Sequence, residues 1–407
     1  MQKWQKNLYS IWIAELFAVI AFQCFYPFVP YYIRELGISK ANEVAFWSGI
    51  IVASSGLSLA LFSPIWGYLG DKYGRKLMLL RAMFGAALWV FLIAFSKNVY
   101  QLLIFRILQG VFAGTVAASI PLVSTTVPQN KLGFSLGFLQ TTLFIGSSLG
   151  PLAGGLIADN FGYKVAIIFA SGLLFIGGLI VLFLVKEKFQ PLSNDKNNEE
   201  KKTFSLKNLY AGFEILKSSK YLLTMVFLLF FVQYSHMAIV PIFPLYVQIL
   251  SKETHYLAST TGFIIAITGV TSSISAVILG RLSDTFDSKK ILIITILGAG
   301  IIYFFQSLVG DVRQLFITRI LLGFFIGGIE PIANTLIGHN VSKDHRGKIY
   351  GISSSARYFG NVGGALSGGI LASFFGIKPV IFLISILFIL MGIWALLIVN
   401  KTNKVVN

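Results

Sequence analysis

The most constraining feature of this sequence is a duplication: short motifs return 213 or 214 residues further along the chain. Pro27-Phe-Val-Pro30 returns as Pro241-Ile-Phe-Pro244, and Arg106-Ile-Leu-Gln-Gly110 returns as Arg319-Ile-Leu-Leu-Gly323. Two spaced sets also repeat: Gly67, Leu69 and Asp71 as Gly280, Leu282 and Asp284, and Gly146, Gly150, Gly154 and Gly155 as Gly360, Gly364, Gly368 and Gly369. The chain is therefore predicted to hold two copies of one helical bundle in series.

The repeated unit is built from apolar runs long enough to cross a membrane. Apolar residues make up 56% of the 407-residue chain and charged residues 12%, and a span of about 20 apolar residues crosses about 30 Å of hydrocarbon. We predict an all-α polytopic membrane protein with twelve transmembrane helices in two six-helix pseudo-repeats. The expected spans are residues 8–32, 45–66, 77–95, 99–121, 134–158, 164–185, 221–249, 258–279, 291–309, 314–337, 349–373 and 379–400.

The basic residues predict the orientation of these helices. With the N-terminus inside, 23 of the 33 lysines and arginines fall on the cytoplasmic side, seven fall outside, and three lie within spans. This bias predicts that both termini are cytoplasmic. The predicted domains are an N-terminal bundle of residues 1–185, a cytoplasmic linker of residues 186–220, which is the longest polar break, and a C-terminal bundle of residues 221–407.

Several other classes of protein are disfavoured. The net charge of +17 is spread over membrane edges, which argues against nucleic-acid binding, and the single cysteine excludes an internal disulfide. Phosphate loops of the GxxxxGK[ST] type are absent, so an internal ATP engine is not expected. The four histidines show no metal-ligand spacing, and no loop offers a nucleophile beside a base. We therefore expect that the protein is not an enzyme and that it binds no cofactor and no metal.

The loop after the second span combines glycines, one acid and three cations in Gly67-Tyr-Leu-Gly-Asp-Lys-Tyr-Gly-Arg-Lys76. Gly70 and Gly74 allow a tight turn. Asp71 is then available to cap a helix start, a contact of about 0.3 to 1 kcal/mol. That size suits a latch that must form and break during a cycle.

The fifth span carries glycines four residues apart, at positions 146, 150 and 154, with Pro151 between them. This spacing predicts a groove without side chains, against which another helix packs closely. Proline removes a backbone hydrogen bond and favours a bend. The groove is therefore predicted to act as a hinge-like sliding surface, although ordinary tight helix packing explains the same glycines.

These motifs together resemble those of the major facilitator superfamily, in its drug:proton antiporter branch. GxLxDxxGRK resembles the superfamily's loop between helices 2 and 3, which implies a cytoplasmic gating role for Gly67, Asp71, Gly74, Arg75 and Lys76, with Asp284 in the second copy. That copy departs from the pattern at Asp287 and Ser288, which puts a symmetric latch in doubt.

Two further elements carry the resemblance. Arg106 opens an RxxxG element often associated with proton coupling. Gly146, Gly150, Pro151, Gly154 and Gly155 match the GxxxGPxxGG antiporter motif, which implies export. The second copy of this motif has Ala365 in place of the proline. The resemblance covers nearly the whole chain and implies a bacterial inner-membrane exporter that expels lipophilic drugs using the proton gradient.

An ion gradient is the expected energy source. A proton driven by roughly 180 mV supplies about 4 kcal/mol, enough for a gradient of about a thousandfold. Two acids lie within predicted spans: Glu330, our first candidate for proton coupling because it adjoins Pro331, and Glu15 near the inner end of the first span, where it couples protons or only bonds locally or faces water. Arg357 is a candidate counterion, and Arg106 either takes part in coupling or binds backbone carbonyls.

The substrate is expected to be a small, lipophilic molecule. Polar and aromatic residues near the middle of three spans are candidates to line its cavity, although helix-to-helix hydrogen bonds explain each of them as well: Gln23, Tyr26, Tyr234, His236 and Asn334. Export of one endogenous metabolite, such as a siderophore or a sugar, is the alternative function. The other expected partners are protons and the lipid bilayer, and the chain is expected to be a monomer.

Overall fold

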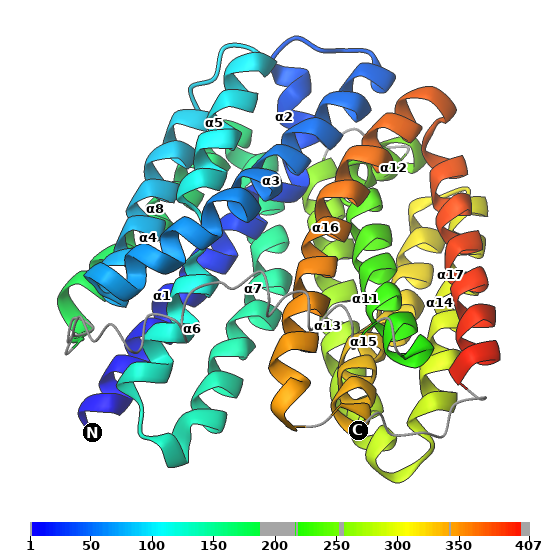
Figure 1. Cartoon of the computed structure of the whole chain (residues 1–407). Helices are drawn as coiled ribbons and strands as arrows, with labels where there is room; N and C mark the ends of the chain where they lie inside the picture. Colours follow the sequence, from blue (N-terminus) through cyan, green and yellow to red (C-terminus); the bar gives the residue numbers. More distant parts are fainter. Residues whose placement is uncertain (1, 188–215, 217–218, 252–255, 342, 400–407) are drawn as a thin grey trace. The chain divides into compact units, whose positions relative to one another are not determined.

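The computed structural model describes residues 2–187, 216, 219–251, 256–341 and 343–399, and its elements there are all helices. The side chains of Asn130, Asp284 and residues 343–348 and 399 are not among those described. The all-α prediction is confirmed. In chain order (Figure 1) the elements are α1 (Lys3–Phe25), η1 (Tyr26–Phe28), α2 (Val29–Glu35), α3 (Ala41–Tyr73), α4 (Arg75–Ile93), α5 (Val99–Phe112), α6 (Thr115–Thr126), η2 (Gln129–Lys131), α7 (Leu132–Phe161), α8 (Tyr163–Leu184), α11 (Lys220–Ile239), α12 (Phe243–Leu250), α13 (Leu257–Thr285), α14 (Ser288–Leu308), α15 (Val312–Asn340), α16 (Lys343–Phe375) and α17 (Ile377–Val399).

Eleven helical stretches of the described chain are long and apolar enough to cross a membrane. The remaining expected span, residues 349–373, lies within α16, which is long enough but is not one of the eleven. Its sequence, rich in glycine and serine and carrying Arg357, lowers its hydropathy. A helix of this composition is suited to packing against other helices rather than facing lipid.

Three of the expected spans are interrupted. The first passes from α1 through the short helix η1 at Pro27 into α2, and the seventh ends at Ile239 before resuming as α12 at Phe243. The fourth is divided into α5 and α6 because Gly114 has a φ of +112°, which a helix cannot accommodate. Repeated prolines and one glycine therefore set breaks that hydropathy alone did not reveal.

The described residues cluster into two compact units. Unit 1 comprises residues 1–193 and 241–266, and unit 2 comprises residues 194–240 and 267–407. This clustering follows spatial contacts, and the predicted sequence boundaries of the two bundles stay a prediction. Most of the predicted linker, residues 188–215 and 217–218, lies outside the described residues.

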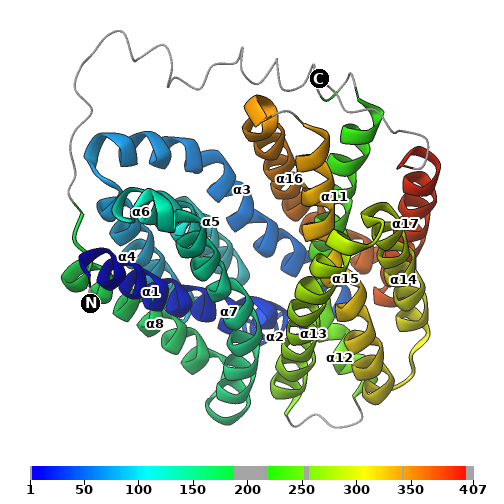
Figure 2. The same ribbon diagram turned by 90° about the horizontal axis from the view of Figure 1, so that it is seen from below.

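The two units repeat the same internal helix pairs. Within unit 1, α1 packs against α7 and α8, and α4 packs against α5 and α8 (Figure 2). Within unit 2, α11 packs against α16 and α17, and α14 packs against α15 and α17. The duplicated sequence thus gives duplicated packing inside each unit.

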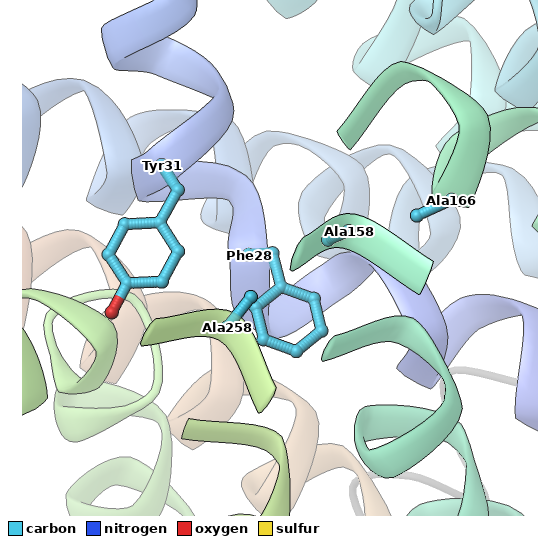
Figure 3. Packing of buried hydrophobic residues seen from close by; sticks show 5 residues of the cluster. All are labelled: Phe28, Tyr31, Ala158, Ala166 and Ala258. Carbon is cyan, nitrogen blue, oxygen red and sulfur yellow. The ribbon is translucent and has the colours of Figure 1, made fainter. Parts of the chain in front are cut away.

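Residues 241–266 belong to unit 1 because apolar and polar contacts hold them there. A buried cluster joins the end of α7 and the start of α8 to α13 (Figure 3), and its members are Phe28, Tyr31, Ala158, Ala166 and Ala258. The Tyr31 hydroxyl donates to the carbonyl oxygen of Pro244 at 2.7 Å and lies 3.1 Å from Thr261 Oγ1.

The start of α13 is capped by an acid from α7. The Asp159 carboxylate accepts hydrogen bonds from the backbone N–H of Ala258 at 3.1 Å and of Ser259 at 2.6 Å. A carboxylate at a helix N-terminus satisfies donors that have no partner within the helix. Asp159 therefore fixes where α13 begins.

Candidate functional site

Most of the charged loop of the first copy is helical, and the turn is shorter than its sequence suggests. Gly67, Gly70 and Asp71 lie in the last turns of α3, and the chain reverses at Gly74, whose φ is +104°. The expected turn is thus present at Gly74, while Gly70 is helical. A side chain at Gly74 would strain the backbone, so Gly74 is the glycine of this loop whose conformation requires glycine.

Arg75 is the residue that connects this loop to its surroundings. Its guanidinium donates to Asp71 Oδ1 at 3.3 Å and to the carbonyl oxygen of Pro121 on α6 at 2.9 Å. The Asp71 side chain is 55% exposed, so the ion pair itself contributes little stability. The hydrogen bond to Pro121 is what links the loop to α6.

Asp71 does not cap α4, contrary to the most direct expectation for this loop. Glu187 does: its Oε1 accepts from the backbone N–H of Arg75 at 3.0 Å and its Oε2 from that of Lys76 at 2.8 Å. The Lys76 ammonium in turn donates to the carbonyl oxygen of Leu182, near the end of α8, at 2.8 Å. The Glu187 carboxylate thus lies at the positive N-terminal end of α4, and the Lys76 ammonium lies at the negative C-terminal end of α8.

Sequence reasoning missed Glu187 because it lies in the polar stretch assigned to the linker. An acid two residues after the predicted apolar span of residues 164–185 was the available signal. In the second copy Asp287 itself caps α14, accepting from the Lys289 N–H at 3.0 Å. Asp284 lies in α13, but its side chain is outside the part of the chain described.

Glu15 is completely enclosed in unit 1. Its side chain is buried, and Oε1 accepts a hydrogen bond from Thr115 Oγ1 at 2.8 Å. Thr115 is the first residue of α6, so the break at Gly114 brings this hydroxyl to the acid. Of the two roles considered besides coupling, exposure to water is excluded in this conformation, and local hydrogen bonding is observed.

Arg106 is also buried, but its partners are neutral. Its guanidinium donates to Gln109 Oε1 at 2.6 Å and to Ser55 Oγ at 2.9 Å. Its guanidinium carbon lies 5.8 Å from the ring centre of Phe25 and 5.3 Å from that of Tyr26. The observed partners are side chains and ring faces rather than the backbone carbonyls considered above, and they suit a cation held in an apolar interior.

In unit 2 the corresponding polar chemistry is different. Arg319, at the place equivalent to Arg106, is buried, whereas Arg357 on α16 pairs with Glu330 on α15 and donates to Ser354 Oγ at 3.1 Å. The Glu330 side chain is 48% exposed. The structure thus brings together the predicted acid and its predicted counterion.

The glycine groove has the predicted close contacts. On α7, a Cβ at Gly150 would lie 2.5 Å from Gln23 Cβ and 2.9 Å from the carbonyl oxygen of Ile20, and one at Gly154 would overlap the carbonyl of Cys24. Gly146 meets Val19 in the same way. Because these neighbours belong to α1 and are largely backbone, α1 and α7 touch at a face that admits no side chain.

The same groove recurs in unit 2 between α16 and α11. A Cβ at Gly360 would lie 2.6 Å from the carbonyl oxygen of Phe230, and those at Gly364 and Gly368 would overlap the carbonyls of Tyr234 and Ala238. In unit 1 the last glycine of the motif, Gly155, contacts a different helix: a Cβ there would overlap the backbone of Ala258 on α13. α7 runs unbroken through Pro151.

The five predicted cavity residues are divided between the two units. Gln23 and Tyr26 lie in unit 1, where Gln23 adjoins the glycine groove. In unit 2, the Tyr234 hydroxyl accepts from Ser367 Oγ at 2.6 Å, and His236 is exposed on α11. At Asn334 it is the main-chain carbonyl oxygen that accepts from the Tyr350 hydroxyl, at 2.9 Å. The side chain of Tyr234 therefore makes the kind of helix-to-helix hydrogen bond that was the alternative to lining a cavity.

Membrane-length helices, internally duplicated packing and buried charged groups define a polytopic membrane protein of the secondary-transporter class. In the described part of the chain no three His, Cys, Asp or Glu residues cluster as metal ligands. The model of the Major Facilitator Superfamily matches residues 11–251 and 237–407. The chain belongs to this superfamily, and it is a transporter rather than an enzyme.

Curated relatives and solved structures agree with this assignment. The chain is 34% identical over 377 residues to "Multidrug resistance protein MdtG" of Salmonella arizonae, covering 93% of this chain and 91% of the relative. It is 35% identical over 391 residues to the protein of that name from Escherichia fergusonii, covering 96% and 93%.

Among solved structures, a bacterial homologue of the human lysosomal transporter Spinster has a TM-score of 0.81 at 12% identity, with 98% of each chain covered. The nucleoside transporter NupG has a TM-score of 0.78 at 12% identity, covering 97% of this chain and 100% of its own. These two show the fold alone.

Proposed function

We propose that this protein exports lipophilic drugs and related small molecules in exchange for protons, by alternating access between two bundles. The observation that carries the proposal is the pair of glycine grooves, α7 against α1 and α16 against α11. Close backbone contact at these grooves packs the helices of each bundle tightly, and two duplicated bundles that are each tightly packed suit a rocking motion around a central site. The relatives named as multidrug resistance proteins support the same direction of transport.

Glu15 is the acid that best fits proton exchange in this proposal. It is buried, and none of the ion pairs formed by described residues includes it. Glu330, our first candidate from the sequence, has Arg357 beside it and is partly solvated. A carboxylate costs much less to keep ionised beside a guanidinium than alone in an apolar interior. Ionising Glu15 therefore costs more free energy than ionising Glu330, and protonation of Glu15 relieves a larger cost.

The remaining parts of the proposal concern the cellular setting. The protein acts as a monomer in the bacterial inner membrane, with both termini in the cytoplasm as the distribution of Lys and Arg indicates. The two bundles comprise residues 1–185 and 221–407, and residues 186–220 link them. The loop residues Gly67, Asp71, Gly74, Arg75 and Lys76 then belong to the cytoplasmic gate.

Transport in everted membrane vesicles tests the proposal. We expect a pH gradient, acid inside, to drive accumulation of a lipophilic cationic dye, and we expect Glu15→Gln to abolish this drive while downhill dye flux persists. Glu330→Gln is the matched variant and should retain most of the gradient-driven uptake. Loss of coupling in Glu330→Gln with full coupling in Glu15→Gln would reverse the assignment.

A second experiment addresses the alternative substrate. Everted vesicles are incubated with a metabolite extract, and the compounds that accumulate inside them on imposing the same gradient are identified by mass spectrometry. Uptake of one metabolite such as a siderophore or a sugar, without dye transport, would replace drug export with export of an endogenous compound.

A further inference from the structure

Unit 1 contains a cavity of about 320 Å³ between α3, α4 and the break that separates α5 from α6. Its volume is within the range of small-molecule sites, about 300 to 1,000 Å³. None of the five predicted substrate-cavity residues belongs to its lining. The residues that matter for its chemistry are Trp66, Asp71, Arg75, Arg81, Ala113 and Gly114.

The charges around this cavity leave one cation without an anion. Asp71, the acid in the lining, pairs with Arg75 at 3.3 Å. Arg81 stacks on the Trp66 ring, with its guanidinium carbon 4.0 Å from the ring centre. Its Nε and Nη1 are buried and have no hydrogen-bond partner among the described residues. These two donors are covered by protein. An occupant of the cavity meets the Arg81 guanidinium as a positive charge that no acidic side chain of the lining balances, which favours an anion.

Trp66 holds the stacked guanidinium in place rather than competing for the occupant. Its indole Nε1 donates to the carbonyl oxygen of Val111 in the last turn of α5 at 2.7 Å. The ring orientation is therefore fixed, and the indole donor is already used. Arg81 is presented to the cavity on a rigid aromatic surface.

The broken helix adds a second source of positive potential. α6 begins at Thr115 after Gly114 and has no side-chain cap, and Ala113, Gly114 and Ala117 line the cavity. The first N–H groups of a helix have no intrahelical partners and carry the positive end of its dipole. The guanidinium and the uncapped helix start thus border the same space.

The rest of the wall is apolar, with Leu59, Met78 and Ala118 among its members. We propose that this cavity binds a small organic oxyanion, a carboxylate or phosphate ester with an apolar body. The oxyanion accepts hydrogen bonds from Arg81 and lies near the start of α6, and the apolar body packs against the aliphatic side chains. This binding does not require that the chain exports drugs or couples to protons.

Binding to the purified full-length protein in detergent tests the proposal, with benzoate as probe and benzamide as its neutral analogue. We expect benzoate to bind by isothermal titration and to raise the melting temperature, and benzamide to bind at least about tenfold more weakly. Arg81→Gln should weaken benzoate binding by about tenfold or more. Arg313→Gln, at an exposed arginine of α15, is the matched control and should bind as wild type.

A second variant keeps the test decisive if Arg81→Gln fails to fold. Ala118→Phe fills the cavity while leaving both residues of the stacked pair unmutated, and we expect it to abolish benzoate binding. Equal binding of benzoate and benzamide, no binding of benzoate, or unchanged binding in Ala118→Phe would each overturn the proposal.

Inorganic phosphate and phosphatidylglycerol distinguish the sources of an anionic group. Competition between phosphate and benzoate supports recognition of the oxyanion. Binding of phosphate or phosphatidylglycerol without any binding of benzoate would overturn the proposal, because the site would then recognise a free ion or a lipid headgroup. Failure of dye transport with intact benzoate binding would count against the proposed function alone.

Discussion

The two copies of the bundle agree in their backbone contacts and differ in their charges. Both have a glycine face on the fifth helix of the copy, packed on the first helix of that copy. The buried acid Glu15 in unit 1 binds a threonine hydroxyl, whereas Glu330 in unit 2 is partly exposed and pairs with Arg357. Close helix contact is thus a property of the repeated architecture, and charge placement belongs to each copy separately.

The N-terminal caps of equivalent helices also differ between the two copies. α4 is capped by Glu187, which lies 112 positions from Arg75, whereas α14 is capped by its own preceding residue, Asp287. In both copies an acid accepts hydrogen bonds from the free N–H groups at the start of the third helix, but the two acids come from different positions in the sequence of each copy. The comparison therefore predicts that glycine substitutions act alike in the two copies and that charge substitutions do not.

The largest expected effect is the loss of either groove. Gly154→Val and Gly364→Val should each lower the free energy of unfolding in detergent by about 3 kcal/mol or more, because the obstructing atoms are backbone and cannot move aside. Gly137→Val is the control, since nothing lies near that position. Measured unfolding that differs strongly between Gly154→Val and Gly364→Val would break the symmetry argued here.

The next effect concerns the buried cation. Arg106→Gln should cost about 1.5 to 3 kcal/mol, since charge-assisted hydrogen bonds to Gln109 and Ser55 are lost in a buried site. Thermal unfolding of the purified variant measures it, with Arg313→Gln on the protein surface as control. A melting temperature equal to that of wild type would show that this network contributes no stability.

A smaller effect is expected at the two caps. Glu187→Ala and Asp287→Ala should each cost about 1 kcal/mol. Hydrogen exchange locates the change: Arg75 and Lys76 amides should exchange faster only in Glu187→Ala, and the Lys289 amide only in Asp287→Ala. Glu43→Ala, which removes an exposed pair with Lys40, should leave all three amides unchanged.

The smallest effect is expected for the ion pair of unit 2. Arg357→Gln should cost about 0.2 to 1 kcal/mol, because the Glu330 side chain is 48% exposed and water replaces much of the lost interaction. Chemical denaturation at low and high salt measures it. A loss as large as that of Arg106→Gln would mean that this pair is more strongly shielded from solvent than its exposure indicates.

Much of the architecture could be predicted from residue patterns because the cause is local. Apolar runs of membrane length, their repetition and the four-residue spacing of Gly146, Gly150 and Gly154 all act through neighbouring turns of one helix. The class of transporter followed from motifs of this kind. The pairing of Glu330 with Arg357 was also predictable, since both are charged residues in apolar spans that need partners.

The tertiary structure decided which distant polar groups meet. Glu187 reaches the start of α4, Thr115 reaches Glu15, and Arg81 stacks on Trp66 across helices. Such contacts depend on the rotation and depth of each helix and on the break at Gly114, which side-chain packing sets throughout a bundle. Periodicity within one helix carries no information about them, because hydrophobicity selects the face that is buried but not the polar atom it meets.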